Sequence, residues 1–375
     1  MVIDSTGYKH KNLFIGLCQE INISFWISLF LIFRVNLALI MRQKILVTGA
    51  GGYIGSVTTE LLLSLGYEVI AVDNFSTGYR QPLELLKKKY GRDKFKFFDL
   101  DIAGNISKLF AKNNIGVVFH FAASCLLDES VKSPGKYFKN NVFATLNLLE
   151  TMERFKVSKI VFSSTCAVYG NAKYFPIDER YETCPQNPYG ESKLMAEKLI
   201  TWYGNLKGLK YVIFRYFNVC GASDVGLIGD SKKPSVILLQ NAVRGALGIE
   251  PFYLTYPKVK TPDKSPIRDY LNVVDLAEAH LVAIKHLKLG GKSEIVNLGT
   301  GTGYSVLEIV KAVQEETDVK FKVNKGKSRE GESYKMIASV KKAKRILGWK
   351  PKRSLRDSIK SLASWYQKHP NGWEY

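Results

Sequence analysis

The sequence predicts an α/β fold: a doubly wound parallel sheet with a smaller C-terminal α/β lobe. From Lys44 onward, short runs rich in β-branched and aromatic residues alternate with amphipathic stretches of helical length. Such alternation is typical of a parallel sheet that is built by right-handed crossovers and covered by helices on both faces. The first short run, KILVTG, also leads directly into a glycine-rich turn, which is typical of a Rossmann-type sheet.

Strands and helices are expected to alternate as far as Asn218. The strands are expected at residues 44–47, 68–72, 94–99, 117–121, 159–163 and 211–215. The helices between them are expected at residues 53–65, 83–90, 106–113, 134–155 and 189–206. After Asn218, loops with Gly and Pro are followed by scattered helices at residues 235–245, 274–286, 306–316 and 354–367. The break in alternation predicts a change of domain.

Three parts are therefore expected along the chain. Residues 41–218 form the sheet domain, to which residues 270–298 return, and residues 219–375 form mainly the smaller C-terminal lobe. At 375 residues the chain is long enough for two lobes, because single cores stop growing near roughly 250–300 residues. Residues 1–40 are interpreted as an extension outside the working fold, since Met41 lies three residues before the first predicted strand.

The extension contains an apolar stretch. Residues 21–41 read INISFWISLFLIFRVNLALIM, which is close to the ~20 residues that span a bilayer. Arg34, Asn22 and Asn36 interrupt it, and no small-x-small cleavage site marks a signal peptide. A single membrane anchor stays open as the alternative to a mis-assigned start, and a membrane is expected as a partner only in that case.

The distribution of charge, cysteine and histidine argues against a nucleic-acid-binding protein and against a metal site. The 54 Lys and Arg give a net charge of +20, but they are scattered along the chain. A solvated basic surface is therefore favoured, and no nucleic acid is expected as a partner. The five Cys contain no Cys-x-x-Cys pair and the five His form no cluster. We therefore expect no metal site and a reducing, cytoplasmic location.

The glycine turn predicts a dinucleotide site. Gly49, Gly52 and Gly55 are spaced G-x-x-G-x-x-G between a strand and a helix. Glycines there permit a tight turn and a close approach to a pyrophosphate, and the N-terminus of the helix favours the anion. Asp73 ends the second strand about 20 residues on, where its carboxylate can accept both ribose hydroxyls but repels a 2′-phosphate. NAD is therefore predicted as the cofactor in preference to NADP.

Two more segments are expected along the dinucleotide. Asp101, after the third strand, is placed to meet the adenine, with a loop-capping role as the alternative. The fourth strand ends in Phe121, Ala122 and Ala123. The small residues there would let the dinucleotide lie close over the sheet.

Tyr189 and Lys193, in NPYGESK, predict a catalytic pair at the start of a helix. Residues at i and i+4 share one helix face, and the strand before this helix ends in Ser163 and Thr165, at the sheet edge where ligands bind. The ammonium, together with a positive nicotinamide ring, is expected to lower the pKa of Tyr189 towards neutrality. The phenolate could then take a proton from an alcohol while Thr165 relays it, so an alcohol-oxidising site is predicted.

Ten stretches carry a resemblance to a known family. They are VTGAGGYIGS, VDNFSTG, HFAAS, ESVKSP, YFKNNV, FSSTCAVYG, NPYGESKL, FRYFNVCGA, IRDYLNVVDLA and VNLGTG. From about Lys44 to the C-terminus the chain resembles the extended short-chain dehydrogenase/reductases, and more narrowly the UDP-glucose 4-epimerases. The resemblance implies a Rossmann-type domain that holds NAD, a smaller domain that holds a UDP-sugar, and commonly a homodimer.

The resemblance also implies a role for individual residues. Tyr189 would be the base at the sugar 4-hydroxyl, Lys193 would bind the nicotinamide ribose and tune Tyr189, and Thr165 would be the relay. Further cofactor contacts fall on Tyr53, Ile54, Asn74, Ile102, Asn140 and Phe217, and further substrate contacts on Asn218, Arg268, Arg329 and Glu332. The implied reaction is hydride removal from sugar C4, turning of the 4-keto sugar and hydride return to its other face.

Several positions depart from the family pattern around the substrate. Cys125 stands where some members carry Lys, and residues 233–236 and 264–266 differ from the usual nucleotide and sugar contacts. Met336 stands about where the family gates an N-acetyl group. A 4-epimerase of UDP-N-acetylglucosamine, UDP-glucuronate or a UDP-pentose therefore stays open as an alternative.

Two more distant readings are disfavoured by single positions. A nucleotide-sugar 4,6-dehydratase would place an Asp-Glu pair after Thr165, where this chain has Cys166 and Ala167. A non-catalytic relative that binds RNA would have no need of Tyr189 and Lys193, and both are present.

Overall fold

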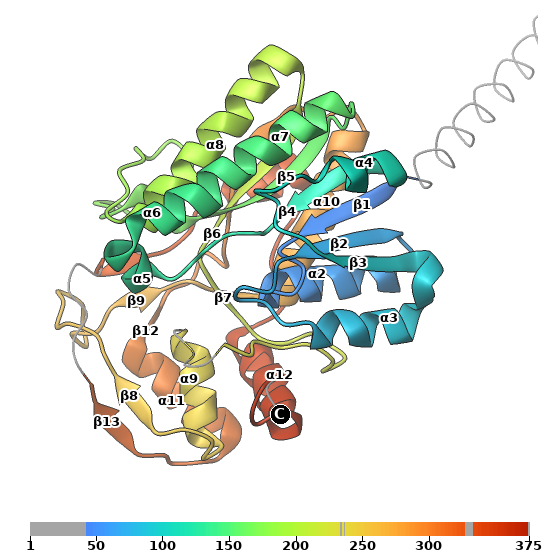
Figure 1. Cartoon of the computed structure of the whole chain (residues 1–375). Coiled ribbons are helices and arrows are strands. Elements are labelled where there is room, and N and C mark those ends of the chain that lie inside the picture. The colour runs from blue at the N-terminus through green and yellow to red at the C-terminus, as the bar shows by residue number, and fades with distance from the viewer. Residues whose placement is uncertain (1–42, 233–234, 236, 327–332, 374–375) are drawn as a thin grey trace, which may run out of the picture. The chain divides into compact units, whose positions relative to one another are not determined.

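A seven-stranded parallel sheet forms the centre of the structure, a computed structural model (Figure 1). The structure describes residues 43–232, 235, 237–326 and 333–373. The strands follow the order β11-β6-β5-β4-β1-β2-β3. They are β1 Lys44–Thr48, β2 Val69–Asp73, β3 Phe95–Asp99, β4 Ile115–His120, β5 Lys159–Thr165, β6 Lys210–Tyr216 and β11 Glu294–Leu298. The predicted doubly wound sheet is confirmed, and β11 adds a strand beside β6 that periodicity did not single out.

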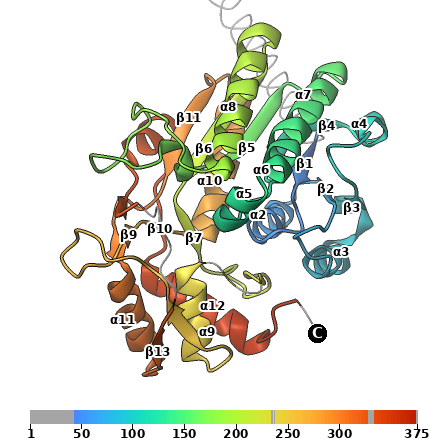
Figure 2. The same ribbon diagram turned by 60° about the vertical axis from the view of Figure 1, so that its left-hand side comes forward.

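Helices cover both faces of the sheet, as Figures 1 and 2 show. They are α2 Tyr53–Ser64, α3 Gln81–Lys94, α4 Ser107–Lys112, α7 Ala144–Arg154, α8 Pro188–Lys207 and α10 Val273–Lys288. Ile45 and Val47 of β1 pack into one core with α2, α3 and α10. Leu46, which points to the other face, packs with α4, α7 and α8. Burial on both faces explains why these strands are short apolar runs with little polar alternation.

The sheet reverses its winding at β1. In the sheet order, β1 has β4 on one side and β2 on the other. Connections from neighbouring strands leave in opposite directions at such a point, so a crevice opens beyond the carboxyl ends of the strands. The glycine turn of Gly49–Gly55 begins at this place.

The helix predicted at residues 134–155 differs in its middle. The structure has α6 Pro134–Tyr137, a π-helical turn at Phe138–Phe143, and then α7. A π-helical turn takes more residues per turn than an α-helix, and such turns are frequent at functional sites. The wider turn holds Asn140 and Asn141, which sequence periodicity could not distinguish from ordinary helix.

The C-terminal part adds a smaller set of helices and short strands, grouped away from the main sheet in Figure 2. Its elements are α9 Leu238–Ala246, β8 Phe252–Leu254, β9 Ile267–Arg268, β12 Tyr304–Ser305, α11 Val306–Thr317, β13 Val323–Lys325, β14 Lys335–Met336 and α12 Leu355–Lys368. The pair of β7 Asn218–Cys220 and β10 Tyr270–Asn272 connects it to the sheet domain. The helices predicted after Asn218 are present, with shifts at their ends.

Several expectations fall outside the described residues. They concern the extension at residues 1–40 with its apolar stretch at residues 21–41, the departures at residues 233, 234 and 236, and the substrate contacts Arg329 and Glu332. Throughout the described ranges, no helix combines the length and the apolar character needed to cross a membrane.

Candidate active site

A cavity of about 500 Å³ lies at the carboxyl edge of the sheet, within the usual size range of small-molecule sites. Every predicted site residue in the described part of the chain lines it. They are Gly49, Gly52, Tyr53, Ile54, Gly55, Asp73, Asn74, Asp101, Ile102, Phe121, Ala122, Ala123, Asn140, Ser163, Thr165, Tyr189, Lys193, Phe217, Asn218 and Arg268. The structure thus brings the predicted cofactor, catalytic and substrate residues into one space.

The glycine loop forms a cradle that side chains would fill. At Gly49, whose φ is +69°, a Cβ would lie 2.5 Å from the backbone nitrogen of Ala122. A Cβ at Gly55 would overlap the carbonyl oxygen of Gly49. Gly52 is the N-cap of α2, and neither a capping side chain nor an acidic residue occupies the first turn. The backbone N–H groups at this helix start therefore suit an anion such as a diphosphate.

Asp73 is held by the backbone and keeps room for a ligand. Its Oδ2 accepts a hydrogen bond from the Gly51 nitrogen at 2.9 Å, and its Oδ1 accepts one from the Phe75 nitrogen at 2.8 Å. Each carboxylate oxygen has a further acceptor site for a ribose hydroxyl. Nearby, Asn74 Nδ2 donates to Asp101 Oδ2 at 3.2 Å. The residues of this end of the cavity fit NAD.

Tyr189, Lys193 and Thr165 meet at the other end of the cavity. Helix α8 begins after the N-cap Asn187, whose side chain accepts a backbone hydrogen bond, so Tyr189 lies on its first turn and Lys193 one turn later. The Lys193 side chain is buried, and its Nζ lies 4.2 Å from the ring centre of Phe162. Thr165, at the end of β5, lies close enough to the Tyr189 hydroxyl to act on its pKa. The geometry fits a proton transfer between a substrate hydroxyl and Tyr189.

The protein's own groups act against the predicted lowering of the Tyr189 pKa. Burial raises the pKa of Tyr189 well above its ordinary value, Tyr216 and Cys125 raise it further, and the neighbouring Thr165 hydroxyl offsets only part of this. Burial also lowers the pKa of Lys193 to about 7. The enclosure that brings phenol and ammonium together removes water from both, which disfavours the charged form of each. Any lowering by a bound nicotinamide ring stays a prediction.

The π-helical turn connects this pair to β4. Asn141 Nδ2 donates to the Ser124 carbonyl at 3.0 Å and to Ser192 Oγ at 2.9 Å, next to Lys193. The Ser124 nitrogen donates back to Asn141 Oδ1 at 2.8 Å. Asn140 Nδ2 donates to the same oxygen at 3.0 Å. Asn141 therefore positions both the end of β4 and the first turns of α8, a role that the sequence analysis missed.

The substrate end of the cavity is built on β7 and β9. The Asn218 nitrogen donates to the Asp269 carbonyl at 3.0 Å, which connects the start of β7 to the residue after β9. Burial raises the pKa of Cys166 to about 12, although the charge of Arg268 acts to lower it. Arg268 therefore lies close to the segment that follows Thr165. Met336, which is buried, lines the same end.

Many residues that line the cavity were absent from the sequence prediction, and four of them carry polar or aromatic side chains of interest. They are Tyr216, Asp230, Lys232 and Trp373. Tyr216 follows the periodicity of β6 and reads as a core residue, although its hydroxyl is hydrogen-bonded to Ser163. Asp230 and Lys232 lie in a loop without periodic pattern. In the sequence, Asp230 and Lys232 appear only as two opposite charges after Gly229. Such a pair does not by itself indicate a binding site.

A family model agrees with this geometry. The model described as "NAD dependent epimerase/dehydratase family" matches residues 45–299. The chain belongs to this family. The match covers the glycine cradle, the Tyr189–Lys193 pair and Arg268, and it confirms the family resemblance and the NAD dependence expected from the sequence.

Individual relatives in the family extend the similarity over almost their whole length. A UDP-glucose 4-epimerase of Lacticaseibacillus casei is 41% identical over 338 residues, which is 88% of this chain and 99% of the relative. One of Halalkalibacterium halodurans is 40% identical, with 88% and 98% covered. A crystal structure of UDP-glucose 4-epimerase from Bifidobacterium longum in complex with NAD+ and UDP has a TM-score of 0.83 and 36% identity, and 88% of this chain and 100% of that chain are covered.

Proposed function

We propose that the protein is a UDP-glucose 4-epimerase, an isomerase that interconverts UDP-galactose and UDP-glucose. The observation that carries this function is the meeting of Tyr189, Lys193 and Thr165 with an NAD cradle in one cavity. Near full-length similarity to UDP-glucose 4-epimerases supports the same substrate.

The proposed chemistry assigns each residue a single task. When bound, NAD supplies the acceptor and then the donor of a hydride at sugar C4. Tyr189 takes the proton of the 4-hydroxyl and later returns it, and Thr165 holds the same oxygen. Lys193 stabilises the phenolate and binds the cofactor ribose. Because the cavity encloses these groups, each interaction is stronger than it would be in water.

The substrate is proposed to lie between the catalytic pair and the smaller lobe. Asn218 and Arg268 would hold the diphosphate, since a guanidinium group suits phosphate oxygens, and Arg329 and Glu332 are retained as contacts from the resemblance. Residues 41–218 with 270–298 would then form the NAD domain, and residues 219–375 mainly the UDP-sugar domain. The extension at residues 1–40 and a cytoplasmic location stay predictions.

The range of sugars is proposed to be wider than glucose and galactose. Met336 lines the substrate end, and a methionine side chain adapts its shape readily. A UDP-Glc/GlcNAc 4-epimerase from Campylobacter jejuni also has this fold, with a TM-score of 0.74 and 34% identity over 87% of this chain. A dehydratase is disfavoured, because Cys166 and Ala167 offer no acid after Thr165.

The protein should convert UDP-galactose to UDP-glucose without added cofactor. Purified chain is incubated with UDP-galactose, UDP-N-acetylglucosamine, UDP-glucuronate and UDP-xylose in parallel, and the products are identified by NMR. NAD bound to the protein is measured after denaturation. A chain that retains NAD but inverts C4 of none of these sugars would contradict the proposed activity.

We also propose a homodimer that forms through α8. Met195, Trp202 and Leu206 are exposed along this helix, with 38%, 61% and 69% of their surfaces accessible. Their spacing places them on one face of the helix, and contiguous exposed apolar side chains mark interaction surfaces. Tryptophan and methionine are enriched in such interfaces.

Trp202→Lys should convert the dimer to a monomer, because a charged side chain would have to lose its water in an apolar interface. Light scattering after gel filtration measures the mass of both forms. Leu289→Lys is the control, since Leu289 is 83% exposed and lies at the end of a different helix, α10. A monomeric unmodified protein, or a Trp202→Lys variant that stays dimeric, would reject this interface.

A further inference from the structure

Lys232 is a cation of the cavity that neither the glycine motif nor the Tyr189–Lys193 pair accounts for. Its Nζ lies 2.9 Å from Sγ of Cys125, which follows the end of β4. The carbonyl of the preceding residue, Ser231, accepts a hydrogen bond from the hydroxyl of Tyr79 at 3.0 Å. Tyr79 lies in the loop that follows β2. The segment of Lys232 therefore contacts the chain beyond two different strands of the sheet.

These contacts place Lys232 over the glycine loop. In the sheet order, β1 lies between β4 and β2, and the glycine loop starts where β1 ends. The Tyr79 nitrogen donates to the Gly51 carbonyl at 2.9 Å, so the loop after β2 rests on the glycine loop itself. Because the Ser231 carbonyl is bonded to Tyr79 and Lys232 Nζ lies at Cys125, the Lys232 side chain extends over the start of α2, which lies between them. The diphosphate of a dinucleotide is expected at this helix start.

The segment that carries Lys232 is rigidly supported. A Cβ at Gly229 would overlap the ring of Trp365 in α12, so the backbone packs directly on this ring. Ser231 Oγ accepts a hydrogen bond from the Trp373 nitrogen at 2.7 Å. Gln81 Nε2 donates to the Trp373 carbonyl at 3.0 Å, which connects the segment to the start of α3. The two residues of the segment before Lys232, Gly229 and Ser231, are therefore held by contacts that involve both lobes.

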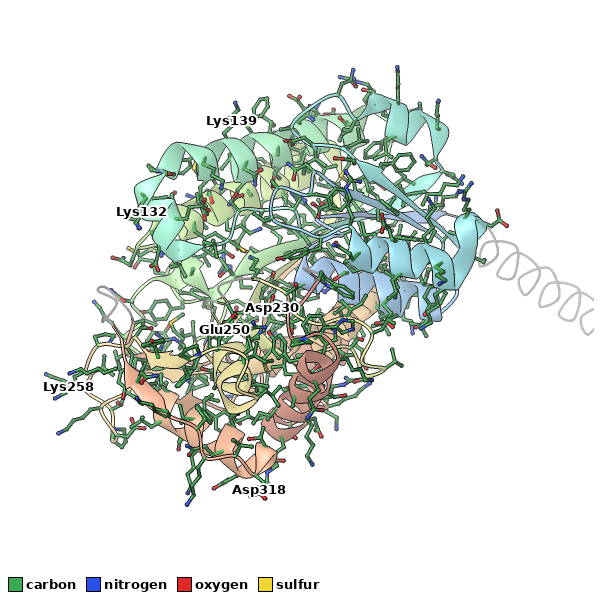
Figure 3. All side chains as sticks on the ribbon, turned by 60° about the horizontal axis from the view of Figure 1, so that its bottom comes forward. Lys132, Lys139, Asp230, Glu250, Lys258 and Asp318 are labelled. Carbon is green, nitrogen blue, oxygen red and sulfur yellow. The ribbon has the colours of Figure 1, made fainter. Side chains whose placement is uncertain are left out.

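Cys125 and Asp230 together favour the charged form of Lys232. Asp230 is 2% exposed, lines the cavity, and lies between the two lobes in Figure 3. Within the described part of the chain its Oδ2 has no hydrogen-bond partner, while Oδ1 accepts from the Lys232 nitrogen at 3.3 Å. Burial alone would lower the pKa of Lys232, but Cys125 and Asp230 outweigh it and raise this pKa. The partly buried ammonium is therefore kept in the charged form that an anion requires.

The described cations of the cavity divide between its two ends. They are Lys193, Lys232 and Arg268. Lys193 lies one turn after Tyr189, and Arg268 lies close to Cys166, so both belong to the reacting end. Lys232 alone among the three adjoins the glycine loop. Among the described residues that line the cavity, the dinucleotide domain offers backbone N–H groups at the glycine loop and no cationic side chain, so a point charge from the smaller lobe would complete the anion site.

We propose that Lys232 binds the diphosphate of NAD from the side opposite the start of α2 and so connects the smaller lobe to the cofactor. The proposal rests on the proposed function, because it takes NAD as the resident cofactor. UDP-sugars carry the same diphosphate chemistry, and the two sources are separated by the experiment. The consequence for the protein is that NAD retention depends on a residue outside the Rossmann-type sheet.

The test compares Lys232→Met and Lys232→Arg with the control Lys258→Met. Lys258 is exposed on the loop after β8, and Figure 3 shows it at the outside of the smaller lobe. NAD per chain is measured after gel filtration, and the Kd of NAD is measured by calorimetry on protein freed of cofactor. Loss of one charge-assisted hydrogen bond should weaken NAD binding about 10- to 100-fold in Lys232→Met. Lys232→Arg should keep most of the affinity, and the control should match the unmodified protein.

The Kd of UDP, measured on the same samples, distinguishes the two diphosphates. We expect it to stay unchanged in Lys232→Met. Weaker UDP binding with unchanged NAD binding would overturn the assignment to NAD, and unchanged binding of both would overturn the diphosphate role. Thermal unfolding of the cofactor-free proteins checks the fold, and Lys232→Gln replaces the Met variant if that one does not fold. These binding results do not require epimerase activity, so failure of the proposed function would be seen separately.

Discussion

Tyr189→Phe should lower kcat for UDP-galactose by roughly two to four orders of magnitude, the usual contribution of a positioned acid–base group. The phenol oxygen is the only atom removed. The remaining ring keeps its edge-to-face contact with Tyr137, whose centre lies 6.3 Å away. NAD content should therefore stay close to that of the unmodified protein. Steady-state kinetics and the NAD content of the same sample measure the two effects.

Tyr174→Phe is the matched control, because Tyr174 is 54% exposed. It should leave kcat unchanged. Full activity in Tyr189→Phe would reject Tyr189 as the base. A parallel loss of NAD would instead show that the hydroxyl is needed for cofactor binding. Thr165→Val should give a smaller loss than Tyr189→Phe, since Thr165 is proposed to act through the same oxygen.

Glu197→Ala should lower the free energy of unfolding by about 3–5 kcal/mol, because it leaves a buried guanidinium without its counter-ion. Arg215 Nη2 lies 2.6 Å from Glu197 Oε2, and the two side chains are 6% and 3% exposed. Ser164, next to Thr165, donates to the other Glu197 oxygen. Glu197 lies one turn beyond Lys193 on α8, and Ser164 precedes Thr165. The substitution should therefore also disturb the positions of these catalytic residues. Urea unfolding measures the change.

The double variant Glu197→Leu with Arg215→Met tests the cause of this loss. Removing both charges should recover much of the stability, since apolar pairs of similar volume often replace buried ion pairs without cost. Glu315→Ala is the exposed control, because its pair with Lys311 is 52% and 77% exposed; it should cost no more than about 0.5 kcal/mol. A loss of that small size in Glu197→Ala would reject the role of the buried pair.

The smaller lobe shows where local sequence stops being informative. Its helices could be predicted from the helical spacing of apolar residues and from residues that cap the helix starts. In α11 the capping box is formed by Ser305 and Glu308, and in α12 by Ser354 and Asp357. Its short strands could not be predicted. Strands of two or three residues, such as β9 and β14, exist only because their partners are placed beside them, and the partner is remote in sequence.

The sequence by itself determined the family, the parallel sheet, the NAD cradle and the Tyr189–Lys193 pair. Each depends on residues close together in the chain: a helical spacing, a glycine turn after a strand, or an acid at a strand end. Such patterns act through backbone geometry and can be recognised without knowing what packs against them. For this reason the predicted residues in the described part of the chain line one cavity.

The tertiary structure alone decided the electrostatics of that cavity and the place of Lys232. Burial opposes the expected lowering of the Tyr189 pKa, and burial depends on the whole fold. Lys232 meets Cys125 across 107 positions of sequence, in a loop with no periodic pattern. The segment before it is held by Trp365, which packs on Gly229, and by Trp373, which donates to Ser231, and these contacts form only when the C-terminal helix packs. Contacts between residues so far apart in the chain leave no recognisable pattern in the sequence around either residue, and they cannot be predicted from that sequence.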